Sequence, residues 1–258
     1  MKFVTSLAAL CLLLGGGVTC EAAETAPVHG VREESRHSQT AKPAFEVDAS
    51  ALEVLSVCRK MLPDCPIMLK GAIIMRSRKG ITQSEYDYTL VADRTKTPAT
   101  VDVVFTPRGE TNVIDHVTVS RPGPVPEGRI LKTDVTWLDL TLDFLWWPNA
   151  MFEAEREGET IHGQKCAVML AKPDKPVAGV SAARLWVDRR TGCMMQAEQL
   201  DEAMKPVRRL WGTRVKKFGE RWMANVIEVE TLGSGHRTKI TVESIDDTIS
   251  STTPKQGK

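Results

Sequence analysis

The sequence lacks the short motifs by which common classes of enzyme are recognised. It contains no phosphate-binding loop, no Gly-x-Ser-x-Gly turn, no Cys-x-x-Cys pair and no His-Glu-x-x-His. None of its five histidines has a neighbour at metal-ligand spacing, and nothing in the sequence places a nucleophile beside a base. These absences predict a protein that is not an enzyme and that has no catalytic residue, no metal and no cofactor.

The sequence also lacks an excess of charge of either sign. Its 34 Lys and Arg residues face 33 Asp and Glu residues, a formal net charge of +1, so no overall field attracts nucleic acid. The run 205–221 is locally basic and has only Glu220 against its cations, which are Lys205, Arg208, Arg209, Arg214, Lys216, Lys217 and Arg221. This run is interpreted either as a solvated strand face or as a patch for an acidic partner or anionic lipid head groups.

No hydrophobic run reaches the length of about 20 residues that a membrane-spanning helix needs. Phe3–Leu14 is almost entirely apolar, follows the basic Lys2 and ends in glycines. This pattern predicts a signal peptide over residues 1–22, cleaved after Cys20 or Ala22, and therefore export. Lipid attachment at Cys20 is the alternative, and membrane contact is otherwise expected to be transient.

Aliphatic residues are scarce on both sides of the central region. Residues 23–48 are polar, with scattered Pro, His and Ser, and are expected to form a disordered tether. Residues 248–258 form a similar tail. Because no repeat or linker interrupts residues 49–247, we expect a single domain there.

Cysteine is rare, and four cysteines remain after the leader: Cys58, Cys65, Cys166 and Cys193. An even number in an exported protein is consistent with disulfides. The spacing around the Pro63 turn favours a Cys58–Cys65 bridge. Cys166 and Cys193 begin strands that are expected to lie two strands apart, about 9 Å, which is beyond disulfide reach. The alternative is four buried free thiols.

The hydrophobic periodicity predicts a mainly β protein of the α+β class. Ser50 and Glu53 form a capping box for a first helix over 50–62, with Leu52, Leu55 and Leu62 on its apolar stripe. From Ile67 the period changes to two, and about eleven strands follow with short connectors. Short connectors require antiparallel pairing, and so many strands should curl into an open half-barrel with the helices on its concave side.

One eleven-residue segment, 137–147, holds three of the six tryptophans and is apolar on nearly every side. A surface helix would have a polar face, so the segment is interpreted as a plug in a hydrophobic cavity, with ordinary core as the alternative. Its only charges, Asp139 and Asp143, are expected to mark a solvent-facing or N–H-paired edge. The candidate ligand-binding residues are Trp137, Leu138, Leu142, Leu145 and Trp146 in the plug, and Ile73, Met75 and Trp186 on the wall.

The segment 137–147 resembles a hallmark of the bacterial outer membrane lipoprotein-sorting protein family. The same resemblance extends, in order and spacing, to Ala183–Arg190 with Gln196–Glu198, Lys216–Phe218, Arg221–Met223 and His236–Ile240. It implies the fold of the periplasmic carriers LolA and LolB, an open antiparallel β-barrel that holds lipoprotein acyl chains on its concave side.

The resemblance implies a non-enzymatic periplasmic carrier that binds lipid acyl chains or lipoproteins and delivers them to the outer membrane. A second class of function stays open: an envelope-stress sensor or scaffold of the same fold that binds a protein partner. An exposed strand edge and the basic run 205–221 would favour that class.

Overall fold

The computed structural model describes residues 43–249, apart from 64, 122, 176, 178 and 220, and it does not describe the side chains of Arg221 and Trp222. The predicted signal peptide with Cys20, most of the tether and nearly all of the tail lie outside these residues. No helix in the described part of the chain is both long and apolar enough to cross a bilayer.

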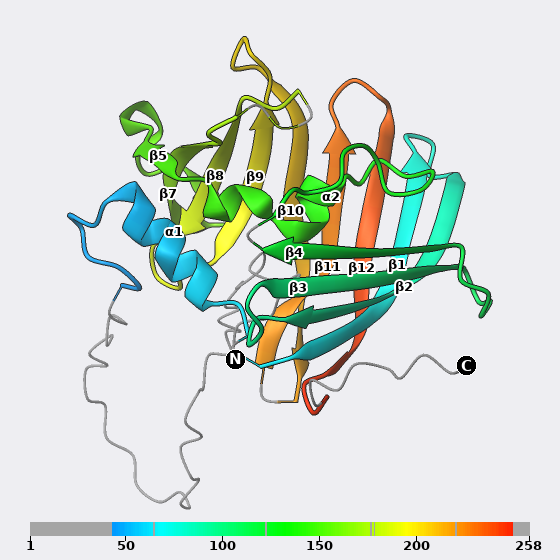
Figure 1. The fold of residues 1–258 in the computed structure, drawn as a ribbon. Helices are drawn as coiled ribbons and strands as arrows, with labels where there is room; N and C mark the ends of the chain where they lie inside the picture. The colour runs from blue at the N-terminus through cyan, green and yellow to red at the C-terminus, as the bar shows by residue number, and fades with distance from the viewer. Residues whose placement is uncertain are drawn as a thin grey trace, which may run out of the picture.

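Twelve strands form one open antiparallel sheet (Figure 1). They are β1 (Ile67–Ser77), β2 (Thr82–Asp93), β3 (Ala99–Pro107), β4 (Asp115–Arg121), β5 (Asn149–Phe152), β6 (Thr160–Ile161), β7 (Gln164–Lys172), β8 (Ala182–Asp188), β9 (Met194–Leu200), β10 (Pro206–Phe218), β11 (Arg221–Thr231) and β12 (His236–Asp246). The order is β4-β3-β2-β1-β12-β11-β10-β9-β8-β7-β5, with β6 paired to β7. The predicted fold class is confirmed, with twelve strands in place of about eleven.

The first helix, α1 (Ala51–Lys60), begins with the predicted capping box. The Ser50 hydroxyl accepts from the Glu53 amide at 3.3 Å, and the Glu53 carboxylate accepts from the Ser50 amide at 2.6 Å. The buried face of α1 consists of Ala51, Val54, Leu55 and Cys58. Leu52, which was predicted on the apolar stripe, is 44% exposed and faces away from the core.

The tryptophan segment forms two short helices, α2 (Trp137–Thr141) and η1 (Asp143–Trp146), separated by Leu142. A further turn, η2 (Ala154–Arg156), follows β5. Figure 1 shows α1 and the α2–η1 segment on one side of the sheet, the side toward which β3 and β4 curl. This is the concave side that the sequence predicted for the helices.

The strand register assigns each side chain to a face, because paired residues point the same way. The row Leu185, Ala197, Leu210 and Val229 faces the helices and belongs to the main apolar core. The next row, Trp186, Gln196, Trp211 and Glu228, lies on the convex face. On that face a small separate cluster consists of Leu170, Ala182 and Leu200.

The four cysteines in the described part of the chain form no disulfide with one another. The Cys58 thiol is buried under α1 and donates to the Gly192 carbonyl at 3.2 Å, so the Cys58–Cys65 bridge is not formed here. Cys166 pairs with Asp188 of β8, whose amide donates to the Cys193 carbonyl. The predicted separation of Cys166 and Cys193 by one intervening strand is confirmed.

Candidate functional site

The candidate site is the plug, residues 137–147, and the concave surface against which it packs. Trp137, Leu138, Leu142 and Leu145 are buried, whereas Trp146 is half-buried. The ring of Trp137 meets Phe105 of β3 edge to face, with centroids 6.1 Å apart. The plug residues predicted to bind a ligand therefore lie together in the closed core of this structure.

The first aspartate of the plug, Asp139, is fully buried and accepts hydrogen bonds from three residues. Arg208 of β10 donates to its carboxylate, and Gln199 of β9 donates at 2.6 Å. The third donor is Thr136, the N-cap of α2, through both its amide and its hydroxyl. Two environments were predicted for Asp139, exposure to solvent or pairing with N–H groups. The structure shows the second, because the carboxylate is buried and accepts hydrogen bonds from N–H donors.

Arg208 is only 8% exposed and also donates to the backbone carbonyl of Asp134, just before α2, and to the Thr231 hydroxyl at 2.7 Å. Its Nε atom has no partner among the described residues. The Asp134 carboxylate is buried as well and lies 3.4 Å from Arg129. One guanidinium thus joins the middle of the sheet to both ends of the segment 134–139.

The second aspartate, Asp143, pairs with Arg121 at the end of the edge strand β4. The Arg121 guanidinium also lies 4.6 Å from the centre of the Trp146 ring, and the Trp147 indole donates to Asp143 at 3.3 Å. Burial lowers the pKa of Arg121 to about 10, so the guanidinium is still charged at neutral pH. The Arg121–Asp143 pair attaches η1 to the edge strand β4, whereas Arg208 attaches α2 to β10.

A third arginine, Arg59 of α1, donates to the Leu145 carbonyl at 2.6 Å. Desolvation lowers the pKa of Arg59 from its usual value. The plug is therefore attached to four elements: α1, β4, β9 and β10. Each attachment is polar, while the surfaces between them are apolar.

Two leucines give the plug region a strained backbone. Leu131, before the segment, has φ 51°, and Leu142, between α2 and η1, has φ 52° and ψ 37°. Left-handed conformation is uncommon outside Gly, Asn and Asp, and for a bulky residue it costs on the order of 1 kcal/mol. Both leucines lie in the chain between β4 and β5.

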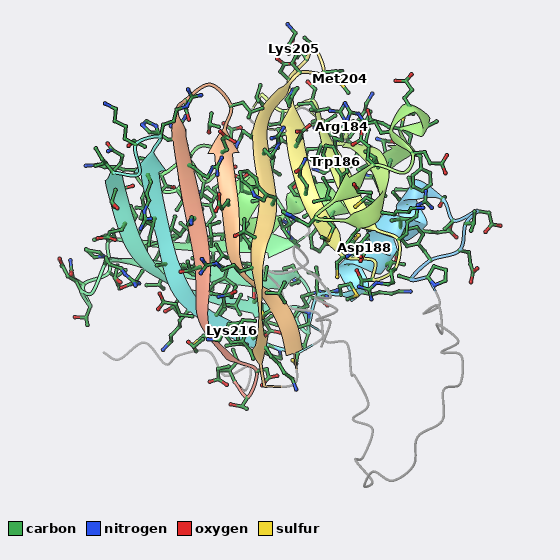
Figure 2. All side chains as sticks on the ribbon, turned by 180° about the vertical axis from the view of Figure 1, so that it is seen from behind. Arg184, Trp186, Asp188, Met204, Lys205 and Lys216 are labelled. Carbon is green, nitrogen blue, oxygen red and sulfur yellow. The ribbon has the colours of Figure 1, made fainter. Side chains whose placement is uncertain are left out.

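The three predicted wall residues do not share a face. Ile73 is buried and Met75 half-buried on the concave face, in register with Ile240 and Thr238. Trp186 lies on the convex face, where its indole donates to Glu159 at 2.8 Å, and Figure 2 shows it from behind the sheet. The prediction that Trp186 lines the cavity was wrong, because both faces of β8 are buried and burial alone does not identify the concave one.

The basic run 205–221 does not form a single patch. Arg208 turns to the concave face, and Arg209 turns to the convex face, where it pairs with Glu198 at 2.7 Å. Figure 2 shows Lys205 and Lys216 near opposite ends of β10. Within the described part of the chain, no group of three or more His, Cys, Asp or Glu residues could hold a metal ion.

The fold is shared with solved structures of other proteins. A family model described as "Uncharacterized protein" matches residues 125–252, which include the plug. No curated protein matches the chain. A solved DUF1329 family protein from Desulfovibrio piger superposes with a TM-score of 0.59 at 14% identity, covering 77% of this chain and 92% of that one.

A solved LolA superfamily protein from Nitrosomonas europaea superposes with a TM-score of 0.57 at 11% identity, covering 77% of this chain and 93% of that one. This chain has the LolA-like fold. A solved domain from Vibrio parahaemolyticus, whose name refers to outer membrane lipoprotein sorting, superposes with a TM-score of 0.53 at 12% identity, covering 76% of this chain and 91% of that one. The resemblance predicted from the sequence is thus confirmed at the level of the fold.

The three arginines that hold the plug were not predicted from the sequence. The signal for them was indirect: two aspartates four residues apart in an apolar run need buried partners. Arg208 was noted only as part of a basic run, and nothing local distinguishes Arg59 or Arg121. Their roles depend on long-range register that the local pattern does not contain.

Proposed function

We propose that this protein is a non-enzymatic periplasmic carrier that binds the acyl chains of lipids or lipoproteins against its concave face. The plug is the element that an acyl chain displaces. The observation that carries the proposal is the attachment of an apolar, strained segment to an apolar surface through a few polar contacts.

The energies are compatible with displacement. A buried methylene contributes about 0.8 kcal/mol, so ten methylenes supply about 8 kcal/mol before entropic costs. Breaking one buried ion pair by removing a partner costs roughly 3–5 kcal/mol, and less if both charges become hydrated. That gain is of the same order as the cost of breaking the Arg208–Asp139 pair, and complete displacement of the plug would also break the Arg121–Asp143 and Arg59–Leu145 contacts.

The structural relatives support the same class of function. One is a LolA superfamily protein, and the name of another refers to outer membrane lipoprotein sorting. The proposed periplasmic location follows from these names together with the predicted signal peptide. The protein would take an acyl chain from a donor at the membrane and pass it to a tighter acceptor, with no covalent step.

A sensor or scaffold that binds a protein partner is the second candidate. The specific observation in its favour is the edge strand β4, which pairs on one side only, with β3. Such an edge can accept a strand from a partner.

Native mass spectrometry of the chain purified from its own envelope separates these functions. Co-purified lipid or lipoprotein supports the carrier, and a stoichiometric protein partner supports the sensor. An apo mass, combined with failure of the delipidated protein to take up a fatty acid, would contradict the carrier.

A further inference from the structure

The convex face of the sheet carries a row of charges that alternate in sign across neighbouring strands. Five residues follow one another in register from β8 to β12: Arg184, Glu198, Arg209, Glu230 and Arg237. Glu198 pairs with both of its arginine neighbours, at 3.3 and 2.7 Å. Opposite charges across adjacent strands stabilise a sheet, so this part of the row is structural.

The alternation breaks at the next strand, β1. Arg76 stands directly opposite Arg237 of β12 and opposite Thr82 of β2, so neither neighbour offers a carboxylate. Arg237 already pairs with Glu228 at 3.0 Å and with Glu230 at 3.8 Å. Among the described residues no ion pair involves Arg76 or Arg78. Like charges directly opposite each other destabilise a sheet unless an anion lies between them.

Arg76 and Arg78 line a hollow of about 380 Å³ at the ends of β1, β11 and β12. Its charged lining comprises Arg76, Arg78, Arg237 and Lys239 against Glu228 and Glu230, four positive and two negative charges, with a net charge of +2. His236 lies at the same edge.

The hairpin backbones hold this edge in place. The Arg78 amide donates to the Gly235 carbonyl at 2.8 Å, which joins the β1–β2 turn to the β11–β12 turn. Gly235 has φ 76° and no side chain, and an added Cβ would lie 4.0 Å from the Arg78 side chain. The Gly235 position therefore lies within ordinary van der Waals distance of the Arg78 side chain.

We propose that this hollow is a binding site for a phosphate-bearing anion, held by Arg76 and Arg78. Guanidinium groups bind phosphate oxygens through paired N–H donors, and a phosphate would relieve the repulsion between Arg76 and Arg237. The anion is either a free phosphate compound or the head group of a phospholipid. The site lies on the face away from the plug and does not depend on the proposed carrier function.

The test uses the purified chain, the double variant Arg76→Gln/Arg78→Gln and the control Arg214→Gln/Lys216→Gln. The control also removes two positive charges, from exposed positions near the C-terminal end of β10 that do not line the hollow. The probes are inorganic phosphate, by titration calorimetry, and flotation with vesicles of phosphatidylcholine alone or in equal parts with phosphatidylglycerol. Thermal unfolding without and with phosphate reports on folding, because a ligand raises the stability of the state that binds it.

We expect the double variant to bind phosphate roughly tenfold more weakly or worse, and the control to bind like the natural chain. Without phosphate, the melting temperature of the double variant should be unchanged or higher, since a repulsion is removed. Binding only to vesicles with phosphatidylglycerol, lost in the double variant alone, would assign the site to a head group. The proposal is overturned if no probe binds, or if the double variant and the control lose binding equally.

Discussion

The variant Asp139→Asn tests whether the plug is a displaceable element or ordinary core. Asp139 is fully buried, and the substitution removes its charge while keeping its size. Arg208 would retain two neutral acceptors, the Asp134 carbonyl and the Thr231 hydroxyl. We therefore expect a loss of about 3 kcal/mol, the lower end of the range for breaking a buried pair. That loss corresponds to a fall in melting temperature of roughly 6–12 °C.

The effect on ligand binding should have the opposite sign. If the Arg208–Asp139 pair holds the plug closed, its loss raises the population of the open state. The apparent affinity for an acyl chain rises by the same factor, which at about 3 kcal/mol is up to roughly 100-fold. The assay is titration of the delipidated protein with a fluorescent fatty acid. We expect binding at least about tenfold tighter than in the natural chain.

Leu200→Ala is the matched control. Leu200 is fully buried in the small convex cluster, away from the plug, and its truncation costs roughly 2–5 kcal/mol. This variant should lose similar stability and keep the natural affinity for the probe. The reasoning is refuted if Asp139→Asn binds the probe no better than Leu200→Ala does.

Three further outcomes are expected. Met204, exposed in the β9–β10 turn (Figure 2), has φ 59°, so Met204→Gly should raise the free energy of unfolding by about 0.5–1 kcal/mol in urea melts, whereas Ala203→Gly should not. Burial raises the pKa of the Cys166 thiol to about 11, whereas its unfolded pKa is near 9. The stabilisation by the protonated thiol is therefore complete below the unfolded pKa and is lost as the pH rises toward 11. The free energy of unfolding of Cys166→Ala should fall less across that pH range than that of the natural chain. Gly71→Ala should prevent folding, seen by circular dichroism, because the added Cβ would lie 1.7 Å from the Thr241 carbonyl oxygen.

The sequence was sufficient to predict the fold class because the relevant signals are local. Alternation from Ile67 onward, short connectors and a capping box at Ser50 require no knowledge of distant contacts. The errors arose where the local pattern is compatible with two assignments of the buried face. On α1, Leu52, Leu55 and Leu62 suggested one stripe, but the helix buries Ala51 and Val54 beside Leu55.

The site was only partly predictable for a related reason. The plug was identified by its composition, since eleven residues with three tryptophans and two charges do not fit a surface helix. The face of Trp186 could not be assigned, because every residue of β8 is buried. Arg208 is 69 positions from Asp139, and Arg121 is 22 positions from Asp143. These contacts depend on strand order and register, which the local sequence pattern does not contain.

Tryptophan quenching tests the central claim most directly. In a variant carrying Trp186→Phe, Trp211→Phe and Trp222→Phe, all remaining tryptophans lie in the plug. Acrylamide, a water-soluble quencher, reaches the indoles of a displaced plug better than indoles buried in the core, where Trp137 and Trp147 lie in this structure. The account predicts that acrylamide quenching increases as fatty acid binds and levels off when binding saturates. Stoichiometric uptake with unchanged acrylamide quenching would contradict it.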